Sequence, residues 1–424
     1  MQHSLISGAR RQMRYPIFDI EVTHPMSDLP LSPEDAGAAI LVRRKGVPIG
    51  FWMQTAKGAS RLSADDVGQR ISAEYATRIV AETIREETAV AAGSTALPLV
   101  TIAICTKDRV ECVERLLRSL RQFDVPLREG GRQLDILLVD NAPSDESTSD
   151  LAAQYPEVRY ICEPRPGLNF ARNRALQEAR GEILAFLDDD VIPDRGWLSG
   201  LADAWGANRD ADAFTGQVLP LELETEAQIL FERRGGFRRG FDRIRFGAVR
   251  PGHPLYPGGA GSFGAGANMA FRTARLRQMG GFDEALDTGA PVPGGGDLDA
   301  FYRLIRAGHI LVYEPRFLVF HQHRREMAAL TRQYRRSWGV GFMCFVTKCL
   351  THDPQRRIPL LRLVAWWFDD RFAFMLRHLK RSVRGDDHLP VLMLIGELWG
   401  GVIGLLGGYG RSQRRVQKIR KRFS

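Results

Sequence analysis

The sequence has few cysteines, and no two of them stand at the spacing of a metal or redox motif. The five cysteines among 424 residues are an odd number and are scattered along the chain. This distribution disfavours a zinc site and a disulfide framework, and it is typical of a protein kept in the reducing cytoplasm. The N-terminal stretch also lacks an uninterrupted apolar run, so we expect no secretory signal and no export.

Acidic residues are fewer than basic ones, and the formal net charge is +9 at pH 7. The excess is concentrated in the C-terminal run RSQRRVQKIRKRF. Such a surface suits anionic lipid headgroups, a pyrophosphate-containing substrate or nucleic acid, and charge alone does not choose among them. The chain length indicates a main domain with one or two appendages, and 44% hydrophobic residues can fill a large core.

The first 95 residues differ in pattern from those that follow. AAILVRRKGVPIGFWM predicts two short strands around a Lys-Gly-Val-Pro turn, and ADDVGQRISAEYATRIVAETIREE predicts an amphipathic helix. We therefore expect a small α+β domain over residues 1–95, whose function the sequence does not indicate.

From Leu97 onward strands and helices alternate. LPLVTIAICT, DILLVD, VRYIC and EILAFLD are apolar runs of the kind that form strands buried on both faces, and helical patterns separate them. This alternation predicts right-handed crossovers and a mainly parallel sheet. The predicted fold class over residues 96–325 is therefore α/β and Rossmann-like. Within it, the glycine- and arginine-rich segment 231–266 predicts a mobile loop near the substrate mouth.

Residues 326–424 predict a helical, membrane-associated region. The run LPVLMLIGELWGGVIGLLGGYG contains Glu397 as its only charge and is long enough to cross a hydrocarbon core of ~30 Å. Gly400, Gly404 and Gly408 stand four residues apart, a spacing that lets another helix approach closely. A buried helix or one lying in the membrane interface fits the same run, so spanning and lying both stay open.

Acidic residues follow apolar runs at wide intervals: Asp140 in LLVDNAPSD, then Asp188 and its two neighbours in LAFLDDDVIP, then Asp297 in GGGDLDAFYRL. The C-terminal end of a buried strand is where an open α/β sheet binds ligands. A single Asp there more often caps a turn or a helix. Three consecutive anions, however, repel one another unless a cation or water neutralises them. The pattern predicts a divalent metal and a nucleotide diphosphate.

Seven motifs in order give the chain its resemblance to the inverting glycosyltransferases of family 2, which have a nucleotide-diphospho-sugar-binding GT-A fold. Over roughly residues 97–325 they are TIAICTKDR, LLVDNAPSD, RPGLNFARNRAL, FLDDDVIPDRGWL, GAGANMAFRTARLRQMGGFDEAL, GGGDLDAFYRLIRAG and HQHR. The resemblance implies a GT-A fold and sugar transfer from a nucleotide-diphospho-sugar, with UDP favoured, to a hydroxyl acceptor. It also implies a divalent cofactor, Mn²⁺ or Mg²⁺.

The resemblance also assigns roles at the nucleotide. It implies that Asp140 accepts a hydrogen bond from the base, that Asp188 contacts the ribose, and that Asp190 binds the metal, with Asp189 assisting. Arg172 suits a diphosphate because a guanidinium matches paired phosphate oxygens. The full predicted set at the nucleotide sugar is Thr106, Asp108, Arg109, Asp140, Asn141, Arg172, Asn173, Asp188 and Asp189.

Asp297 is the predicted general base, which removes the proton of the acceptor hydroxyl. The family usually shows Glu-Asp here, and Gly296 replaces the Glu in this chain. The alternative for Asp297 or Asp299 is helix N-capping, and we expect one of the two to cap. His321 or His323, on an extended segment, is predicted to complete the metal shell, with His321 preferred and a structural role as the alternative.

The remaining predicted residues shape the sugar and acceptor pockets. They are Trp197, Asn268, Asp283 and Asp299. Trp197 is equally compatible with the protein core.

The C-terminal region predicts the acceptor and the location. We expect a lipid-linked acceptor or a growing surface polysaccharide at the cytoplasmic face of the inner membrane, and no nucleic-acid partner. Two rival functions fit part of the sequence. A nucleotidyltransferase should carry a glycine-rich, lysine-containing loop after the first strand, which we do not find. A non-catalytic membrane scaffold would not account for both Asp190 and Asp297.

Overall fold

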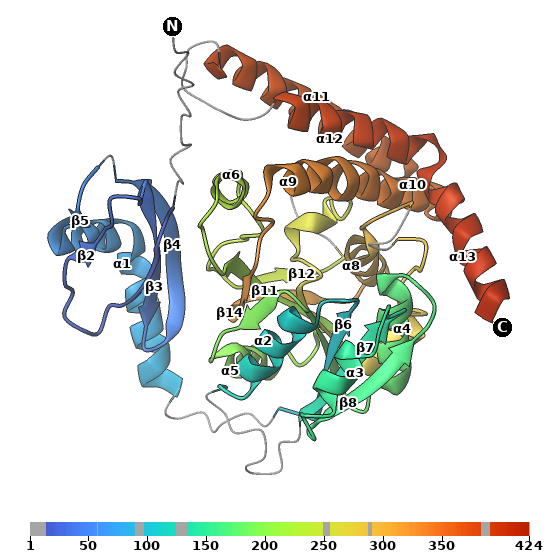
Figure 1. The fold of residues 1–424 in the computed structure, drawn as a ribbon, viewed down its shortest axis with the longest axis horizontal. Coiled ribbons are helices and arrows are strands. Elements are labelled where there is room, and N and C mark those ends of the chain that lie inside the picture. Colours follow the sequence, from blue (N-terminus) through green and yellow to red (C-terminus); the bar gives the residue numbers. More distant parts are fainter. Residues whose placement is uncertain are drawn as a thin grey trace, which may run out of the picture. The chain divides into compact units, whose positions relative to one another are not determined.

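The computed structural model divides into two compact units (Figure 1). It describes residues 14–56, 58–89, 97–123, 134–248, 255–286, 291–382 and 391–423. The first unit comprises residues 1–93, 220–236 and 323–327, and the second comprises 94–219, 237–322 and 328–424. The first segment ends at residue 93, and the predicted boundary stands at residue 95. Two later segments also join the first unit, and the C-terminal helices share one unit with the predicted α/β domain.

The first unit is the predicted small α+β fold. Its strands and helices are β1 (Ile17–Glu21), β2 (Leu29–Pro30), β3 (Gly37–Arg44), β4 (Val47–Thr55), β5 (Arg61–Leu62), α1 (Ala64–Ala89) and α6 (Glu226–Arg233). The strands β3 and β4 form the predicted hairpin, in which Lys45 and Gly46 adopt left-handed φ angles of 45° and 79°. Such a two-residue turn matches the twist of the strands that it joins.

The second unit contains a nine-stranded sheet in the order β10-β14-β11-β13-β9-β6-β7-β8, with β12 paired to β14. Its strands are β6 (Val100–Thr106), β7 (Leu134–Asn141), β8 (Val158–Glu163), β9 (Ile183–Asp188), β10 (Val191–Pro193), β11 (Ala213–Pro220), β12 (Ile244–Phe246), β13 (Asn268–Arg272) and β14 (Leu311–His321). The neighbours β9, β6, β7 and β8 are parallel, as predicted. Antiparallel strands extend the sheet beyond β9, beginning with β13.

Helices cover both faces of this sheet because each central strand is apolar on both sides. They are α2 (Val110–Leu120), α3 (Ser147–Ala152), α4 (Leu168–Glu178), α5 (Trp197–Ala207), α7 (Thr273–Gln278) and α8 (Gly296–Arg306), with a 3-10 turn η1 (Ala260–Ser262). Along β6, Ile102 and Ile104 belong to the core on one face, and Ala103 and Cys105 to the core on the other. Alternate strand residues point to opposite faces, so one apolar strand supplies both cores.

The C-terminal region is helical, as predicted. Its elements are α9 (Met327–Gln333), the π-helix η2 (Tyr334–Gly341), α10 (Phe342–His352), the 3-10 turn η3 (Pro354–Arg356), α11 (Arg357–Ser382), α12 (Val391–Ile403), the π-helical turn η4 (Gly404–Gly408) and α13 (Tyr409–Phe423). A Cβ on Gly404 would lie 2.7 Å from the Cβ of Met343, and one on Gly400 would overlap the carbonyl of Arg335. The close approach predicted from the glycine spacing is therefore present, and the partners are η2 and α10 of the same chain.

Candidate active site

The end of β9 carries the three consecutive carboxylates predicted to lie at a ligand site. Asp188 is the last residue of β9, and Asp190 directly precedes β10. The antiparallel pairing of β10 with β14 places Val191 opposite His321. As a result, the Nε2 atom of His321 lies 3.3 Å from the Oδ1 atom of Asp190. The two residues predicted to hold a metal are therefore adjacent in space although 131 positions separate them in the chain.

Residues at the end of β6 hold the middle carboxylate. The hydroxyl of Thr106 donates to Oδ2 of Asp189 over 2.7 Å. The guanidinium of Arg109 pairs with Asp189 and also, over 3.0 Å, with Oδ2 of Asp190. Burial raises the pKa of Asp189 to about 7, against the lowering effect of Arg109. A cation already neutralises part of this acidic cluster, as the repulsion between neighbouring carboxylates requires.

A second cation and the predicted base complete the site. Arg172 of α4 is buried, and its Nη2 atom lies 3.4 Å from Oδ1 of Asp188. The backbone N–H of Gly266 donates to Oδ2 of Asp297 over 2.9 Å. A Cβ on Gly266 would lie 3.0 Å from Arg172 Nη2 and 3.1 Å from Asp297 Oδ2. Because Gly266 has no side chain, Arg172 and Asp297 both approach it closely, and Arg172 also contacts Asp188.

The start of α8 differs from the predicted capping. The N-cap is Gly295, whose φ of +95° lies in the left-handed region, and no side chain caps the helix. Asp297 and Asp299 both lie inside the first turn, so the expectation that one of them caps is wrong. The Asp297 carboxylate instead accepts hydrogen bonds from Gly266 and from the N–H of Leu298.

The structure also explains why glycine replaces the family's Glu before Asp297. A Cβ on Gly296 would lie 2.6 Å from the carbonyl oxygen of Leu286 and would overlap the side-chain amide of Asn169. Asn169 uses that amide to hold the backbone of Asp283 and Leu286. No side chain fits at position 296 in this packing.

Restoring the glutamate should therefore damage this protein. We expect Gly296→Glu to lower the free energy of unfolding by about 1–3 kcal/mol, the usual cost of an overpacked site, and to lower activity by displacing Asp297. Gly410→Ala is the matched control, because a Cβ there meets nothing within 4 Å. Chemical denaturation of both variants checks this. A Gly296→Glu protein as stable as the Gly410→Ala protein would contradict the packing argument.

Asp140 lies at the end of β7, at the same edge of the sheet. Its side chain is fully buried, and the hydroxyl of Tyr160 donates to Oδ2 over 3.0 Å. No group in the described part of the chain donates to its other oxygen, Oδ1. Burial raises the pKa of Asp140. A buried acceptor without a donor is costly, so Asp140 is suited to accept a hydrogen bond from a ligand.

Asp108 and Asn141, both predicted to bind the nucleotide, form hydrogen bonds to neighbouring loops. Asp108 has a left-handed φ of 52° and accepts 2.8 Å hydrogen bonds from the N–H and the hydroxyl of Ser144, which lower its pKa. Asn141 accepts a hydrogen bond from the N–H of Gly167 over 2.8 Å. Both groups join the loops that follow neighbouring strands.

Trp197 and Asn268 lie in the core, which is the alternative position that stayed open for Trp197. Both are fully buried, and the indole N–H of Trp197 donates to Oδ1 of Asn268 over 3.0 Å. The Trp197 ring also packs 4.6 Å from the ring of Phe317. The side chain of Asn173, which was predicted at the nucleotide, donates a hydrogen bond to the carbonyl of Phe282 and accepts one from the N–H of Phe282. These contacts satisfy the polar groups within the protein.

Three further predicted residues have protein partners. Asp283 and Asp299 lie 3.0 and 2.6 Å from Nζ of Lys348 and form ion pairs with it. His323 is buried with its Nε2 atom 2.8 Å from Oε1 of Glu232, within the first unit. The structural alternative therefore holds for His323, and of the two histidines His321 is the one beside Asp190.

Residues 101–249 match the family model described as glycosyl transferase family 2. The matched segment runs from β6 to β12 and includes the three carboxylates at the end of β9. It is 28% identical over 230 residues to the pre-mycofactocin glycosyltransferase of Mycobacterium tuberculosis, covering 54% of this chain and 43% of that protein. It is 33% identical over 106 residues to the succinoglycan biosynthesis protein ExoM of Rhizobium meliloti, covering 24% and 33%. The chain thus spans less than half the length of these curated relatives.

A solved structure is also similar to this chain. It is the mannosyltransferase PcManGT from Pyrobaculum calidifontis in complex with GDP-Man and Mn²⁺, with 18% sequence identity and a TM-score of 0.47. The similarity covers 77% of this chain and 86% of that one.

Sequence reasoning did not single out Phe237, which lies beside the predicted metal ligand His321. The ring of Phe237 lies 5.3 Å from the ring of His321 and 6.4 Å from that of Trp338. The only sequence signal was the run GGFRRGF, which we interpreted as part of a mobile loop.

Two side chains of the second unit were predicted to hold a divalent metal. In the described ranges no three His, Cys, Asp or Glu side chains gather into a metal-binding group. Asp190 and His321 nevertheless lie side by side at the edge of the sheet. Mg²⁺-like ions in nucleotide sites commonly take only one or two protein ligands, with phosphate and water oxygens as the rest. The donor set therefore fits a metal that binds together with a diphosphate.

Proposed function

We propose that the protein is an inverting glycosyltransferase. It moves one sugar from a nucleotide-diphospho-sugar, UDP-linked in this proposal, to a hydroxyl of a lipid-linked acceptor or a growing saccharide. The observation that carries this proposal is the convergence of Asp297, Arg172 and Asp188 at Gly266. A carboxylate base, a phosphate-binding cation and a nucleotide-binding carboxylate at one point are what such a transfer requires.

The donor would bind along the C-terminal ends of β7, β6 and β9. Asp140 offers the base a carboxylate oxygen that has no donor within the described chain. Asp188 offers an acceptor to the ribose, as the family resemblance implies. Arg172 would pair with the diphosphate through its forked guanidinium. When a divalent metal is held by Asp190 and His321, it stabilises the negative charge that develops on the leaving diphosphate.

Asp297 would act on the acceptor. It takes the proton of the acceptor hydroxyl while that oxygen forms a bond to the anomeric carbon. The bond from the anomeric carbon to the diphosphate breaks, and its electron pair leaves with the phosphate oxygen. Attack from the face opposite the leaving group inverts the configuration in one step. The hydrogen bond from Gly266 fixes Asp297 for this role.

The C-terminal helices would place the enzyme on a membrane surface. The helix Val391–Phe423 is long enough to cross a membrane and contains a sufficiently apolar stretch. Its backbone leaves helical geometry at Leu406 and Gly407. The 13 residues of α12 extend only about 20 Å at 1.5 Å per residue, and a bilayer core is about 30 Å thick. We therefore favour a helix that lies on the membrane.

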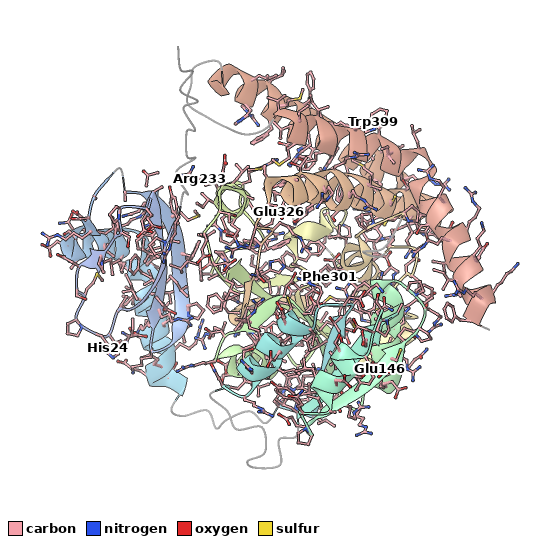
Figure 2. All side chains as sticks on the ribbon, in the orientation of Figure 1. His24, Glu146, Arg233, Phe301, Glu326 and Trp399 are labelled. Carbon is pink, nitrogen blue, oxygen red and sulfur yellow. The ribbon has the colours of Figure 1, made fainter. Side chains whose placement is uncertain are left out.

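An exposed apolar face supports this orientation. Leu392 and Trp399 of α12 are 77% and 58% exposed, and Figure 2 shows Trp399 on the outer helices. Further exposed apolar residues on α11, α12 and η4 are Ile358, Leu361, Trp366, Phe372, Leu376, Leu379, Ile395 and Leu406. Basic residues exposed nearby on α11 and α13 include Arg357, Arg362, Arg377, Arg411, Arg414, Lys418, Lys421 and Arg422. Apolar side chains flanked by cations are typical of helices at anionic interfaces.

Charging this face should release the protein from membranes. We expect Leu392→Asp with Trp399→Asp to weaken binding to phosphatidylglycerol-containing vesicles at least ~10-fold, since each buried large apolar side chain contributes roughly 1.5–3 kcal/mol. Val80→Asp with Ile84→Asp is the control, because both residues are 56% exposed on α1 of the other unit. Vesicle flotation measures the difference. Equal binding by the two double variants would contradict the assignment of this face.

The proposed activity has a direct test. The purified protein is incubated with radiolabelled UDP-, GDP- and TDP-sugars, Mn²⁺ and a lipid extract. We expect label on lipid or saccharide with release of the nucleoside diphosphate. Release of pyrophosphate would favour a nucleotidyltransferase, and nucleotide binding without turnover would favour a non-catalytic scaffold. Either result would contradict the proposal.

A further inference from the structure

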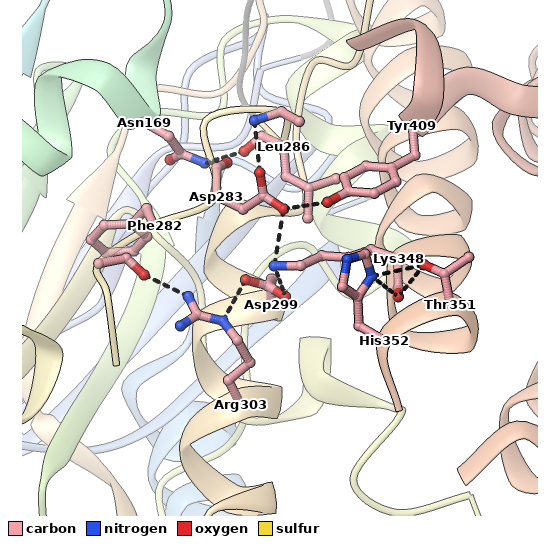
Figure 3. A network of polar contacts seen from close by, with 12 residues as sticks. Asn169, Phe282, Asp283, Leu286, Asp299, Arg303, Lys348, Thr351, His352 and Tyr409 are labelled. Atoms are coloured by element: carbon pink, nitrogen blue, oxygen red, sulfur yellow. Dashed lines mark hydrogen bonds and ion pairs between the residues drawn. The ribbon is translucent and has the colours of Figure 1, made fainter. Parts of the chain in front are cut away.

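A buried polar cluster joins the helix of the proposed base to the C-terminal helices (Figure 3). At its centre, Nζ of Lys348 lies 2.6 Å from Oδ1 of Asp299 and 3.0 Å from Oδ2 of Asp283. The hydroxyl of Tyr409 donates to the same Asp283 oxygen over 2.7 Å. Arg303 donates to the other oxygen of Asp299 over 2.7 Å. We call these five residues the Lys348 cluster.

The Lys348 cluster connects three helices and a loop. Asp299 and Arg303 belong to α8, Lys348 to α10 and Tyr409 to α13, while Asp283 lies in the loop that precedes α8. Lys348 is therefore the only member through which α10 reaches this cluster, and it contacts both the helix and the loop.

The burial of the cluster makes its charges interdependent. The side chain of Asp299 is 1% exposed and that of Lys348 is 12% exposed. Burial alone would raise the pKa of Asp283, but Lys348 and Tyr409 outweigh that effect, and the pKa is lowered. A carboxylate buried as deeply as Asp299 needs its cations, because a buried charge without a partner is strongly destabilising.

Backbone packing also joins the start of α8 to η2 and α10. The hydroxyl of Ser337 in η2 donates to the carbonyl of Pro293 over 3.0 Å. A Cβ on Gly295 would lie 2.9 Å from the carbonyl oxygen of Gly341 and 3.3 Å from Cβ of Phe345. The turn directly before Asp297 thus rests on η2 and α10, without room for a side chain between them.

We propose that Lys348 is a positioning residue for the transfer reaction. By bridging Asp299 to Asp283, it fixes α8 against the C-terminal helices and so sets the place of Asp297, two residues before Asp299. The C-terminal region is then part of the catalytic unit as well as a membrane-binding surface. This inference rests on the proposed function, in which Asp297 is the base.

The loop that contains Asp283 also contacts residues of the proposed donor site. Asn169 of α4 donates to the backbone carbonyl of Asp283 over 2.8 Å and accepts from Arg172 over 3.4 Å. Glu284 pairs with Arg420 of α13 over 2.7 Å. A shift of the C-terminal helices would therefore act on α8 first, because α8 is held directly by Lys348, and on Arg172 only through the loop.

The test compares Lys348→Met, Lys348→Arg and the neutral pair Lys348→Met with Asp299→Asn. Arg118→Met is the control, because Arg118 lies on α2, is 69% exposed and pairs only with the exposed Glu114 of the same helix in the described structure. The probe is whichever UDP-sugar the wild-type protein turns over with Mn²⁺. For each variant the melting temperature, kcat and the donor KM are measured well below the melting temperature.

We expect Lys348→Met to lower kcat about 10- to 100-fold while the donor KM changes less than about 2-fold, since a base out of place affects the chemical step. Lys348→Arg should recover most of kcat. The neutral pair should recover part of the melting temperature, because the deeply buried charge of Asp299 is removed together with its cation, but should keep the low kcat. Arg118→Met should match the wild type in all three quantities.

Two results would overturn the positioning role. If the neutral pair recovers kcat together with the melting temperature, Lys348 only stabilises the fold. If KM rises while kcat stays at the wild-type value, Lys348 acts on donor binding. A wild-type protein without turnover of any nucleotide sugar is a different failure: it contradicts the proposed function, and the positioning role falls with it.

Discussion

Asp297→Asn is expected to leave donor binding intact and to lower kcat by roughly 10²- to 10⁴-fold, the usual effect of losing a general base. The amide has the same shape as the carboxylate and can still accept the hydrogen bond from Gly266 through its oxygen. It cannot take the proton of the acceptor hydroxyl. The fall should therefore appear in kcat, and the affinity for UDP with Mn²⁺, measured by calorimetry, should stay within about 2-fold of wild type.

A matched control separates the loss of the base from a general loss of charge. Asp203→Asn removes an equivalent carboxylate that pairs with Arg316 and is 53% exposed. An exposed pair contributes only about 0–1 kcal/mol, so this variant should retain both stability and kcat. If Asp297→Asn turned over as fast as Asp203→Asn, another group would have to be the base.

The fold was predictable to the extent that it depends on local pattern. The alternation of apolar strands and helices from Leu97 specified the parallel core of the sheet, and those strands are present as β6 to β9. The hairpin of the first unit followed from the turn at Lys45 and Gly46. Each of these features is decided within about ten residues of sequence.

Long-range partners could not be predicted in the same way. The pairing of Asp283 and Asp299 with Lys348 joins residues 65 and 49 positions apart. From the sequence alone these acids could be placed only after a turn, and so we predicted that both shape a pocket. The core position of Trp197 on α5 depends on contacts with Asn268 of β13 and Phe317 of β14. Such contacts arise only when the strands are placed in order.

The glycines of the C-terminal region show how one pattern can serve two structures. A spacing of four residues allows close helix contact in a membrane or in water. In this protein Gly400 and Gly404 contact η2 and α10, and Glu397 pairs with Arg371 of α11 over 3.3 Å. These contacts assign one side of α12 to the protein. The opposite side, with Leu392 and Trp399, is left for the membrane surface that we propose.

Asp190→Asn is expected to remove the metal dependence of donor binding. In the proposed site Asp190 and His321 are the protein ligands, and an amide oxygen is a far weaker ligand for a hard cation than a carboxylate. The affinity for UDP should then be the same with and without Mn²⁺, whereas wild type should bind UDP more tightly with Mn²⁺. We expect kcat to fall at least ~10²-fold, because the metal supplies several kcal/mol of charge stabilisation in the transition state.

Calorimetry with UDP, at several Mn²⁺ concentrations, decides this without relying on turnover. Asp369→Asn, on the exposed side of α11, is the control and should keep the wild-type response to Mn²⁺. Loss of Asp190 also leaves Arg109 with Asp189 as its remaining partner, so a change in stability is measured separately by thermal unfolding. An Asp190→Asn protein that still bound UDP more tightly with Mn²⁺ would show that the metal has other ligands, and the site built on Asp190 and His321 would be wrong.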